Sequence, residues 1–175
     1  MTITEALAEI KTIDKRIRSK QEFIRNYIMR MDNVKDPLEK DGGSFKVLAE
    51  EMQAVGDLEK RIVELRRGIQ SANEKTKVSL EGTEMSIADW LIWRREVLPN
   101  RRIFLNALRS TMSNNREAVR RNSWGVKEAD KTSPPDIVVN IDEKALMSEL
   151  EKLSKIEGDL DGQLSLKNAT VLISG

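Results

Sequence analysis

Residues 3–31, ITEALAEIKTIDKRIRSKQEFIRNYIMRM, carry a large apolar residue at every seventh position. Apolar side chains with this period lie along one face of an α-helix and form a narrow seam for a partner helix. A second row with the same period is interrupted by polar residues. The first row is Ile3, Ile10, Ile17, Ile24 and Met31, and the second is Leu7, Asp14, Gln21 and Ile28. The stretch therefore predicts one long helix with a narrow apolar face.

A second seven-residue repeat follows a break at residues 33–44. The break contains Pro37, which disfavours helix in the residue before it, and Gly42–Gly43, which allow the chain to reverse. The helix expected after Ser44 has one row of Leu48, Val55, Ile62, Ile69 and Thr76, and another of Glu51, Leu58, Leu65 and Ala72. The two repeats together predict a long antiparallel helical hairpin or bundle with coiled-coil-like seams.

A third helix is expected after a turn at residues 80–84, with Ser86 as its N-cap. Pro99 lies inside this helix and must kink or split it, because proline lacks the amide donor and clashes with the preceding turn. Its expected apolar rows are Trp90, Val97 and Phe104, and Leu91, Leu98, Leu105 and Met112. We expect Trp90 in the core.

The rest of the chain predicts an irregular linker and a fourth helix. Residues 137–141 are β-branched and read as a short extended arm, and Asp142 can cap the helix that follows. That helix carries Leu146, Leu150, Leu153, Leu160 and Leu164, with Glu157 in the gap. The sequence thus predicts a mainly α chain in three parts that form one structural unit: residues 1–113, 114–142 and 143–175.

Composition argues against most enzyme chemistries. The 175 residues include no cysteine and no histidine, which excludes thiolate or histidine metal ligands and histidine general bases. Gly42–Gly43 lacks the Lys-Ser/Thr of a phosphate-binding loop, and Glu50–Glu51 reads as a solvated helix face. We therefore expect a non-enzymatic protein with no catalytic residue, cofactor or metal.

The middle and end of the chain resemble the septicolysin-like family of small bacterial helical proteins. The matching residues are Arg61, Ile62, Leu65, Ile69, Ala72, Asn73, Thr76, Gly82, Thr83, Ser86, Ala88, Asp89, Leu91, Arg94 and Arg95, then Leu160, Asp161, Leu164, Asn168 and Leu172. The chain departs from the family at Ala169, where members usually have Trp, and at Glu96, where they often have Asp. The resemblance implies a helical protein, and the family name suggests a cytolysin. It implies no catalytic residue, and most members have no assigned activity.

Arginines gather in one segment and acidic residues in another. The basic patch consists of Arg94, Arg95, Arg101, Arg102, Arg116, Arg120 and Arg121, with Arg109 between them. It reads either as a nucleic-acid surface or as a helix that faces the acidic segment 136–161, in the same chain or in a neighbour. A net charge of only +1 favours pairing.

These features predict a structural or assembly protein that works through helix-mediated homo-oligomerisation, such as a phage virion component. Candidate contact residues are Ile10, Ile17, Ile24, Leu58, Leu65, Trp93, Trp124 and Leu172. The alternatives are a septicolysin-like, membrane-active protein and an arginine-mediated nucleic-acid binder. The start of the sequence has no signal-peptide pattern and no window is apolar enough to span a membrane, so we expect a cytoplasmic or virion protein.

The apolar tail, residues 168–174, is the last expected contact. Val171, Leu172 and Ile173 in water would favour aggregation. We expect the tail to pack on the helical hairpin or to add to a neighbour's extended arm; the alternative is a frayed terminus.

Overall fold

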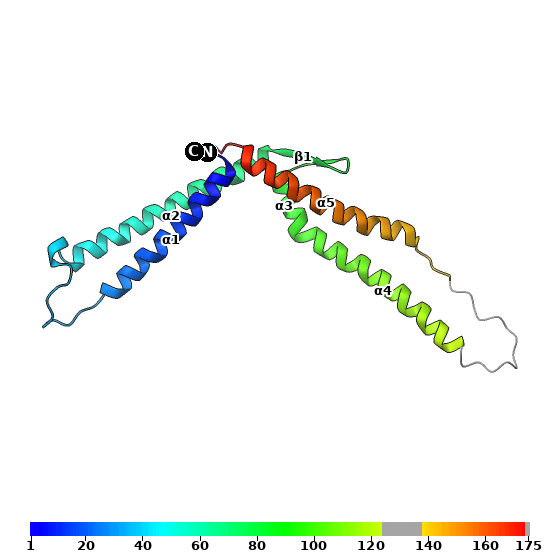
Figure 1. The fold of residues 1–175 in the computed structure, drawn as a ribbon, viewed down its shortest axis with the longest axis horizontal. Helices are drawn as coiled ribbons and strands as arrows, with labels where there is room; N and C mark the ends of the chain where they lie inside the picture. Colours follow the sequence, from blue (N-terminus) through cyan, green and yellow to red (C-terminus); the bar gives the residue numbers. More distant parts are fainter. Residues whose placement is uncertain (124–137, 174–175) are drawn as a thin grey trace. The chain divides into compact units, whose positions relative to one another are not determined.

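The computed structural model describes residues 1–123 and 138–173, and in these the chain is mainly helical, as predicted (Figure 1). The helices of four or more turns are α1 (Ile3–Tyr27), α2 (Ser44–Lys75), α4 (Leu98–Ser123) and α5 (Glu143–Thr170). Shorter elements connect them: the 3-10 turn η1 (Glu39–Asp41), strands β1 (Lys77–Leu80) and β2 (Thr83–Ser86), the helix α3 (Ile87–Ile92) and the π-helical turn η2 (Trp93–Val97).

The chain divides into two compact units. The first unit contains residues 1–77 and 164–175, and the second contains residues 78–163. Helix α5 contributes residues to both units. This grouping differs from the ranges expected from the sequence, which placed the third helix with the first two.

In the first unit, α1 and α2 lie side by side and run in opposite directions (Figure 1). Ile3, Ile10 and Ile17 of the predicted first row are buried, whereas Met31 lies beyond α1 and is 73% exposed. The second buried row is Ala6 and Ile13, one residue before the predicted row of Leu7 and Asp14. Leu7 of the predicted row is partly buried and packs against the same core, so the predicted row borders the buried one. Both occur because an apolar stripe can follow the first row at a spacing of three or of four residues. On α2 the contacting residues are Val55, Leu58, Ile62, Leu65, Ile69 and Ala72.

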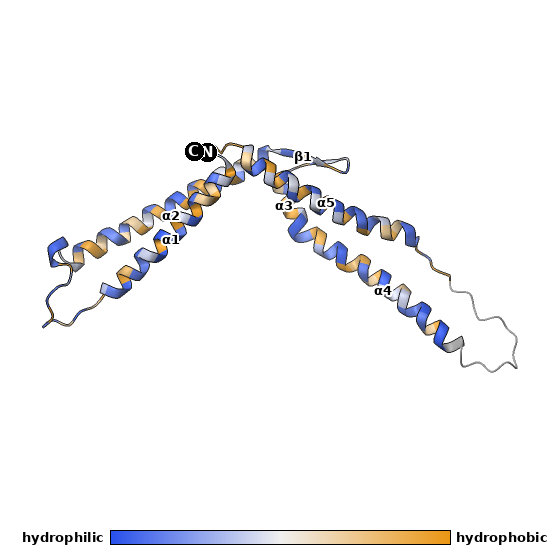
Figure 2. Ribbon diagram, in the orientation of Figure 1, coloured by the Kyte–Doolittle hydropathy of each residue, from blue (hydrophilic) through white to orange (hydrophobic). Residues whose placement is uncertain are grey.

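The hydropathy pattern matches this packing. Figure 2 shows hydrophobic and hydrophilic segments alternating along α1 and α2.

A capping box starts α1: the Glu5 amide donates to Thr2 Oγ1 (3.2 Å) and the Thr2 amide donates to Glu5 Oε2 (2.8 Å). These two hydrogen bonds fix the start of α1 at Ile3.

Asp36 joins the loop to the start of α2. Its carboxylate accepts hydrogen bonds from the amides of Ser44 (2.8 Å) and Leu38 (2.9 Å), and from the Ser44 hydroxyl. The α2 N-cap, Gly43, has no side chain for this purpose, so Asp36 supplies the acceptor from eight residues upstream of Ser44. These hydrogen bonds lower the pKa of Asp36 from its ordinary 3.8 to about 2, those from Ser44 contributing most.

The Asp36 hydrogen bonds predict a pH dependence of stability. A lowered pKa in the folded state stabilises the fold fully above pH 3.8, and this contribution is lost as pH falls through about 2. In urea unfolding between pH 5 and 2, we expect Asp36→Asn to reduce the slope of unfolding free energy against pH. Asp32→Asn, in the same loop, is the control with the same change of charge, and the reduction expected for Asp36→Asn is measured relative to it. Equal slopes for the parent and Asp36→Asn would contradict the prediction.

The tail packs against the first unit, which confirms one of the two contacts predicted for it. The Ile173 amide donates to the Met1 carbonyl (2.9 Å), and the Ile3 amide donates to the Val171 carbonyl (3.2 Å). Leu172 forms an antiparallel bridge with Thr2, and the side chain of Ile173 is buried with Ile3. The alternative of a frayed terminus is wrong for residues 171–173.

The second unit begins with a β-hairpin where the sequence predicted only a turn. Strands β1 and β2 pair, and the two residues between them, Glu81 and Gly82, have φ of 47° and 80°. Positive φ at both central positions matches the twist of a tight hairpin, and glycine adopts it without strain. The strands were missed because four residues on each side give too short an alternating pattern.

A π-turn accommodates Pro99 and shifts the register of the third helix. The Leu98 amide donates to the carbonyl of Trp93, five residues back. Pro99 then takes the second position of α4, where a missing amide donor costs little. Leu98 and Leu105 of the second predicted row are buried, and Met112 of that row packs against the same core. The additional residue connects the buried Trp90 to this row, so Val97 and Phe104 of the first predicted row are exposed instead of buried as predicted.

Helix α4 extends ten residues further than expected. Residues 114–123, predicted as irregular, are helical, and residues 124–137 of the predicted linker and arm lie outside the described part of the chain. Residues 138–141 precede α5 and form no strand with the described part of the chain, while Ile137 lies outside it. Leu98 and Leu105 of α4 pack with Leu146 and Leu153 of α5.

Candidate functional site

The basic patch on η2 and α4 pairs with acidic residues of α5 in the same chain. Four ion pairs join them: Arg94–Asp161 (2.7 Å), Arg101–Glu149 (2.8 Å), Arg102–Glu157 (2.8 Å) and Arg116–Glu143 (2.9 Å, Nη1–Oε2). Opposite charges placed on two antiparallel helices fix their relative register. The prediction that the basic segment faces the acidic helix is therefore confirmed within one chain.

Arg116 makes the most specific of these contacts. Both of its terminal nitrogens donate to the two carboxylate oxygens of Glu143, a planar two-point contact that lysine could not reproduce. Glu143 raises the pKa of Arg116 above its ordinary range. Elsewhere in the patch, Arg95 pairs with Glu96 and Arg121 with Glu117, both on the same helical segment as their partners.

A further ion pair joins α5 to the turn of the β-hairpin. Lys155 Nζ donates to Glu81 Oε1, which lowers the pKa of Glu81 and raises that of Lys155. The side chain of Glu81, at the strained turn position, is thereby held against α5. The sequence gave no signal for this contact because the two residues are 74 positions apart.

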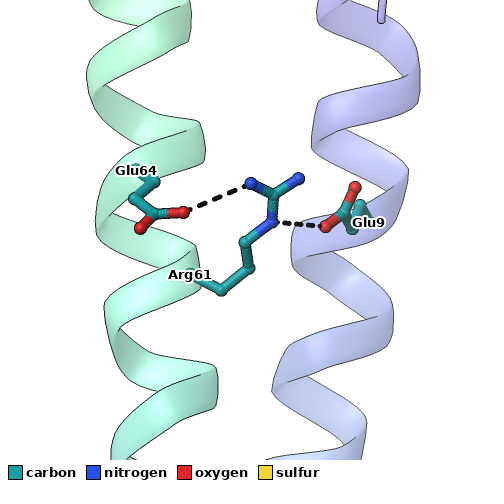
Figure 3. Close-up of polar contacts among 3 residues, drawn as sticks. All are labelled: Glu9, Arg61 and Glu64. Carbon is teal, nitrogen blue, oxygen red and sulfur yellow. Dashed lines mark hydrogen bonds and ion pairs between the residues drawn. The ribbon is translucent and has the colours of Figure 1, made fainter. Parts of the chain in front are cut away.

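In the first unit, Arg61 of α2 binds two carboxylates. Its Nε donates to Glu9 Oε1 of α1 (2.8 Å), and its Nη1 donates to Glu64 Oε2 one turn along α2 (3.2 Å; Figure 3). Glu9, followed by Glu64, raises the pKa of Arg61. Lys20 and Glu51 form a second pair between α1 and α2 (2.6 Å). These pairs flank the apolar contact and set the register of the two helices.

The residues predicted to contact an oligomeric partner have different surroundings. Ile10, Ile17 and Leu65 are buried between α1 and α2 of one chain, and Leu58 packs against the same core. Ile24 lines an apolar groove of about 460 Å³ together with Gln21, Arg25, Met52 and Val55. Of these isoleucine and leucine positions on α1 and α2, only Ile24 lines this open groove.

The remaining predicted contacts lie in the second unit or at the tail. Trp93 packs against the α4–α5 core and meets Trp90 edge to face, with ring centroids 5.5 Å apart. Leu172 keeps an exposed side chain although its backbone is bridged to Thr2. Trp124 lies outside the described residues.

Large apolar side chains lie exposed on two helices. On α2 these are Phe45, Met52 and Val63, and on α4 they are Ile103 and Phe104. Side chains this exposed are available to a partner, and where they form a contiguous apolar surface they mark an interaction site in soluble proteins. The sequence analysis missed the α2 residues, although a second seven-residue spacing between Phe45 and Met52 was available to find them.

Residues 1–123 and 138–173 hold no cluster of His, Cys, Asp and Glu that could bind a metal ion. Among the described residues no helix is both long and apolar enough to cross a bilayer. Comparison of the chain with protein-family models, with curated proteins and with solved structures found no match.

Proposed function

We propose that this chain is a non-enzymatic assembly protein that acts through helix-mediated homo-oligomerisation. The observation that carries the proposal is the exposed apolar surface of α2, where Phe45 is 91% and Met52 is 64% exposed. Removing such side chains from water by packing two chains together contributes about 25 cal/mol per Å² buried. A coiled-coil-like seam between two chains would bury these side chains, and the seven-residue spacing between Phe45 and Met52 of α2 suits such a seam.

The charge distribution supports a structural role for the arginines. Four of them pair with acidic residues of α5, so these guanidinium groups already have carboxylate partners. A nucleic-acid surface would need such groups free for phosphates. DNA binding measured at several salt concentrations tests this. We expect charge reversal at Arg101 and Arg102 to leave any salt-dependent DNA binding unchanged.

The oligomer is tested by light scattering on the full chain during size-exclusion chromatography at micromolar concentration. We expect a mass of at least twice the 19.9 kDa chain. A single species at the chain mass across this concentration range would overturn the proposal. A component of a particle, such as a virion protein, is one kind of assembly protein. Head and tail genes beside the gene for this chain would support that role.

The resemblance to septicolysin-like proteins motivates an alternative, a membrane-active protein. Leakage of liposomes at a protein amount well below that of lipid would distinguish a membrane-active protein from an assembly protein. We favour assembly because the exposed apolar residues follow the spacing of helix–helix contacts, and large charged faces flank them on α2.

A further inference from the structure

The outer face of α2 carries an apolar stripe that α1 does not cover. We define the outer stripe as Phe45, Ala49, Met52, Gly56 and Val63. Successive spacings of four, three, four and seven residues place all five on one side of the helix. This side is roughly a third of a turn from the row that packs on α1.

The two halves of the outer stripe complement each other. When a second α2 is laid antiparallel, with both helices centred on Ala54, Phe45 lies opposite the second copy's Val63 and Met52 opposite its Gly56. A larger side chain then meets a smaller one at both positions. Ala49 lies opposite Glu59 of the second copy, so four of the five stripe residues match their own reverse. Self-complementarity of this kind is what a two-fold contact between identical chains requires, and this identifies the occupant as a second copy.

Space for this contact exists at the centre of the stripe. A Cβ atom built on Gly56 would meet no atom within 4 Å, so a Met52 side chain from a second copy can lie against the helix there. The apolar groove beside Met52, lined also by Ile24 and Val55, gives this flexible side chain further room. The stripe and groove extend the contact from α2 onto α1.

The expected size fits a specific dimer. A contact that includes Phe45, Met52, Val63 and the groove would bury on the order of 500 Å² on each chain, or about 1,000 Å² in total. This is near the lower limit for specific interfaces and predicts a reversible dimer in place of an obligate one.

We infer that two copies of this chain pair antiparallel through the outer stripe of α2, about a two-fold axis near Ala54. The inference rests on the proposed homo-oligomerisation and specifies its surface and orientation. Any larger assembly would then be built from these dimers.

Cysteine cross-linking tests the orientation directly, because the chain contains no native cysteine. Phe45→Cys and Val63→Cys are made as separate single variants and oxidised alone and as a mixture. In the antiparallel pair, the two copies of residue 45 lie about 27 Å apart along the helix axis, whereas residues 45 and 63 face each other. Disulfides need Cα atoms within about 7 Å, so we expect cross-linked dimers in the mixture and none from either variant alone.

The other outcomes overturn the pairing in separate ways. Cross-links within each single variant would indicate a parallel contact, and an oligomer without cross-links would indicate another surface. Either result leaves the proposed homo-oligomerisation standing. A monomer by light scattering would overturn both, so the two failures are distinguishable.

A matched pair of substitutions tests the energetics. Phe45→Glu should weaken the dimer at least tenfold in Kd and leave the helical circular dichroism and Tm unchanged, since the side chain is almost fully exposed. Gly56→Leu fills the space for Met52 and should also weaken it at least tenfold. Phe104→Glu, the same substitution at a phenylalanine of α4 that is 61% exposed, is the control and should alter the Kd less than twofold. A Phe45→Glu protein that dimerises like the parent would overturn the inference.

Discussion

Trp90→Ala should lower the unfolding free energy by about 3–5 kcal/mol, the usual cost of deleting a buried aromatic side chain. Trp90 is 2% exposed, and its indole Nε1 donates to the Val78 carbonyl at 3.0 Å. The substitution leaves a cavity and removes the donor to a strand carbonyl, so both packing and hydrogen bonding are lost. Urea unfolding followed by circular dichroism measures the change.

Two variants separate these contributions. Trp90→Phe keeps most of the apolar volume, so it should lower the unfolding free energy less than Trp90→Ala does. The loss that Trp90→Phe still causes reflects the missing hydrogen bond and the smaller ring. Phe104→Ala, at an exposed position of the following helix, should change stability by less than about 0.5 kcal/mol. A Trp90→Ala cost as small as that of Phe104→Ala would show that Trp90 is not a core residue.

Deleting residues 169–175 should cost about 3 kcal/mol or more. Ile173 is 7% exposed in the core with Ile3, and Val171 packs against the same core. Burial of one such side chain contributes about 1.5–3 kcal/mol, and the deletion also removes the hydrogen bonds to Met1 and Ile3. The expected result is a lower Tm for α1 and α2, measured by thermal unfolding.

Point variants control for the loss of chain length. Ile173→Asp places a charge in the core and should reproduce most of the loss, whereas Leu172→Ala changes a side chain that is 70% exposed and should have little effect. If the truncated protein melts like the parent and the amides of residues 171–173 exchange at random-coil rates, the tail does not stabilise the fold.

The seven-residue rows predicted where the long helices lie, because a helix must bury its apolar face whether the partner helix belongs to the same chain or to another. They did not choose between Leu7 and Ala6 beside Ile3, since both positions border the same stripe. The register beyond Trp90 also could not be predicted, because a π-turn adds one residue without altering the local composition. The β-hairpin depends on backbone angles at Glu81 and Gly82, which the sequence indicates only as a turn.

The candidate site was predictable in part. Separate blocks of basic and acidic residues predicted the pairing of α4 with α5, because opposite charges of this density favour contact. The individual partners, such as Arg102 with Glu157, depend on the shifted register and needed the structure. The outer stripe of α2 is visible in the sequence once the core-facing rows have been assigned.

The contribution of α5 to both units has a consequence for protein synthesis. Residues 1–77 leave the ribosome long before residues 164–173, and residues 78–163 are translated between them. Until then, Ile3 lacks the Val171 carbonyl and the Ile173 side chain that cover it. A nascent chain therefore carries an uncovered apolar end at the start of α1 while the whole second unit is translated.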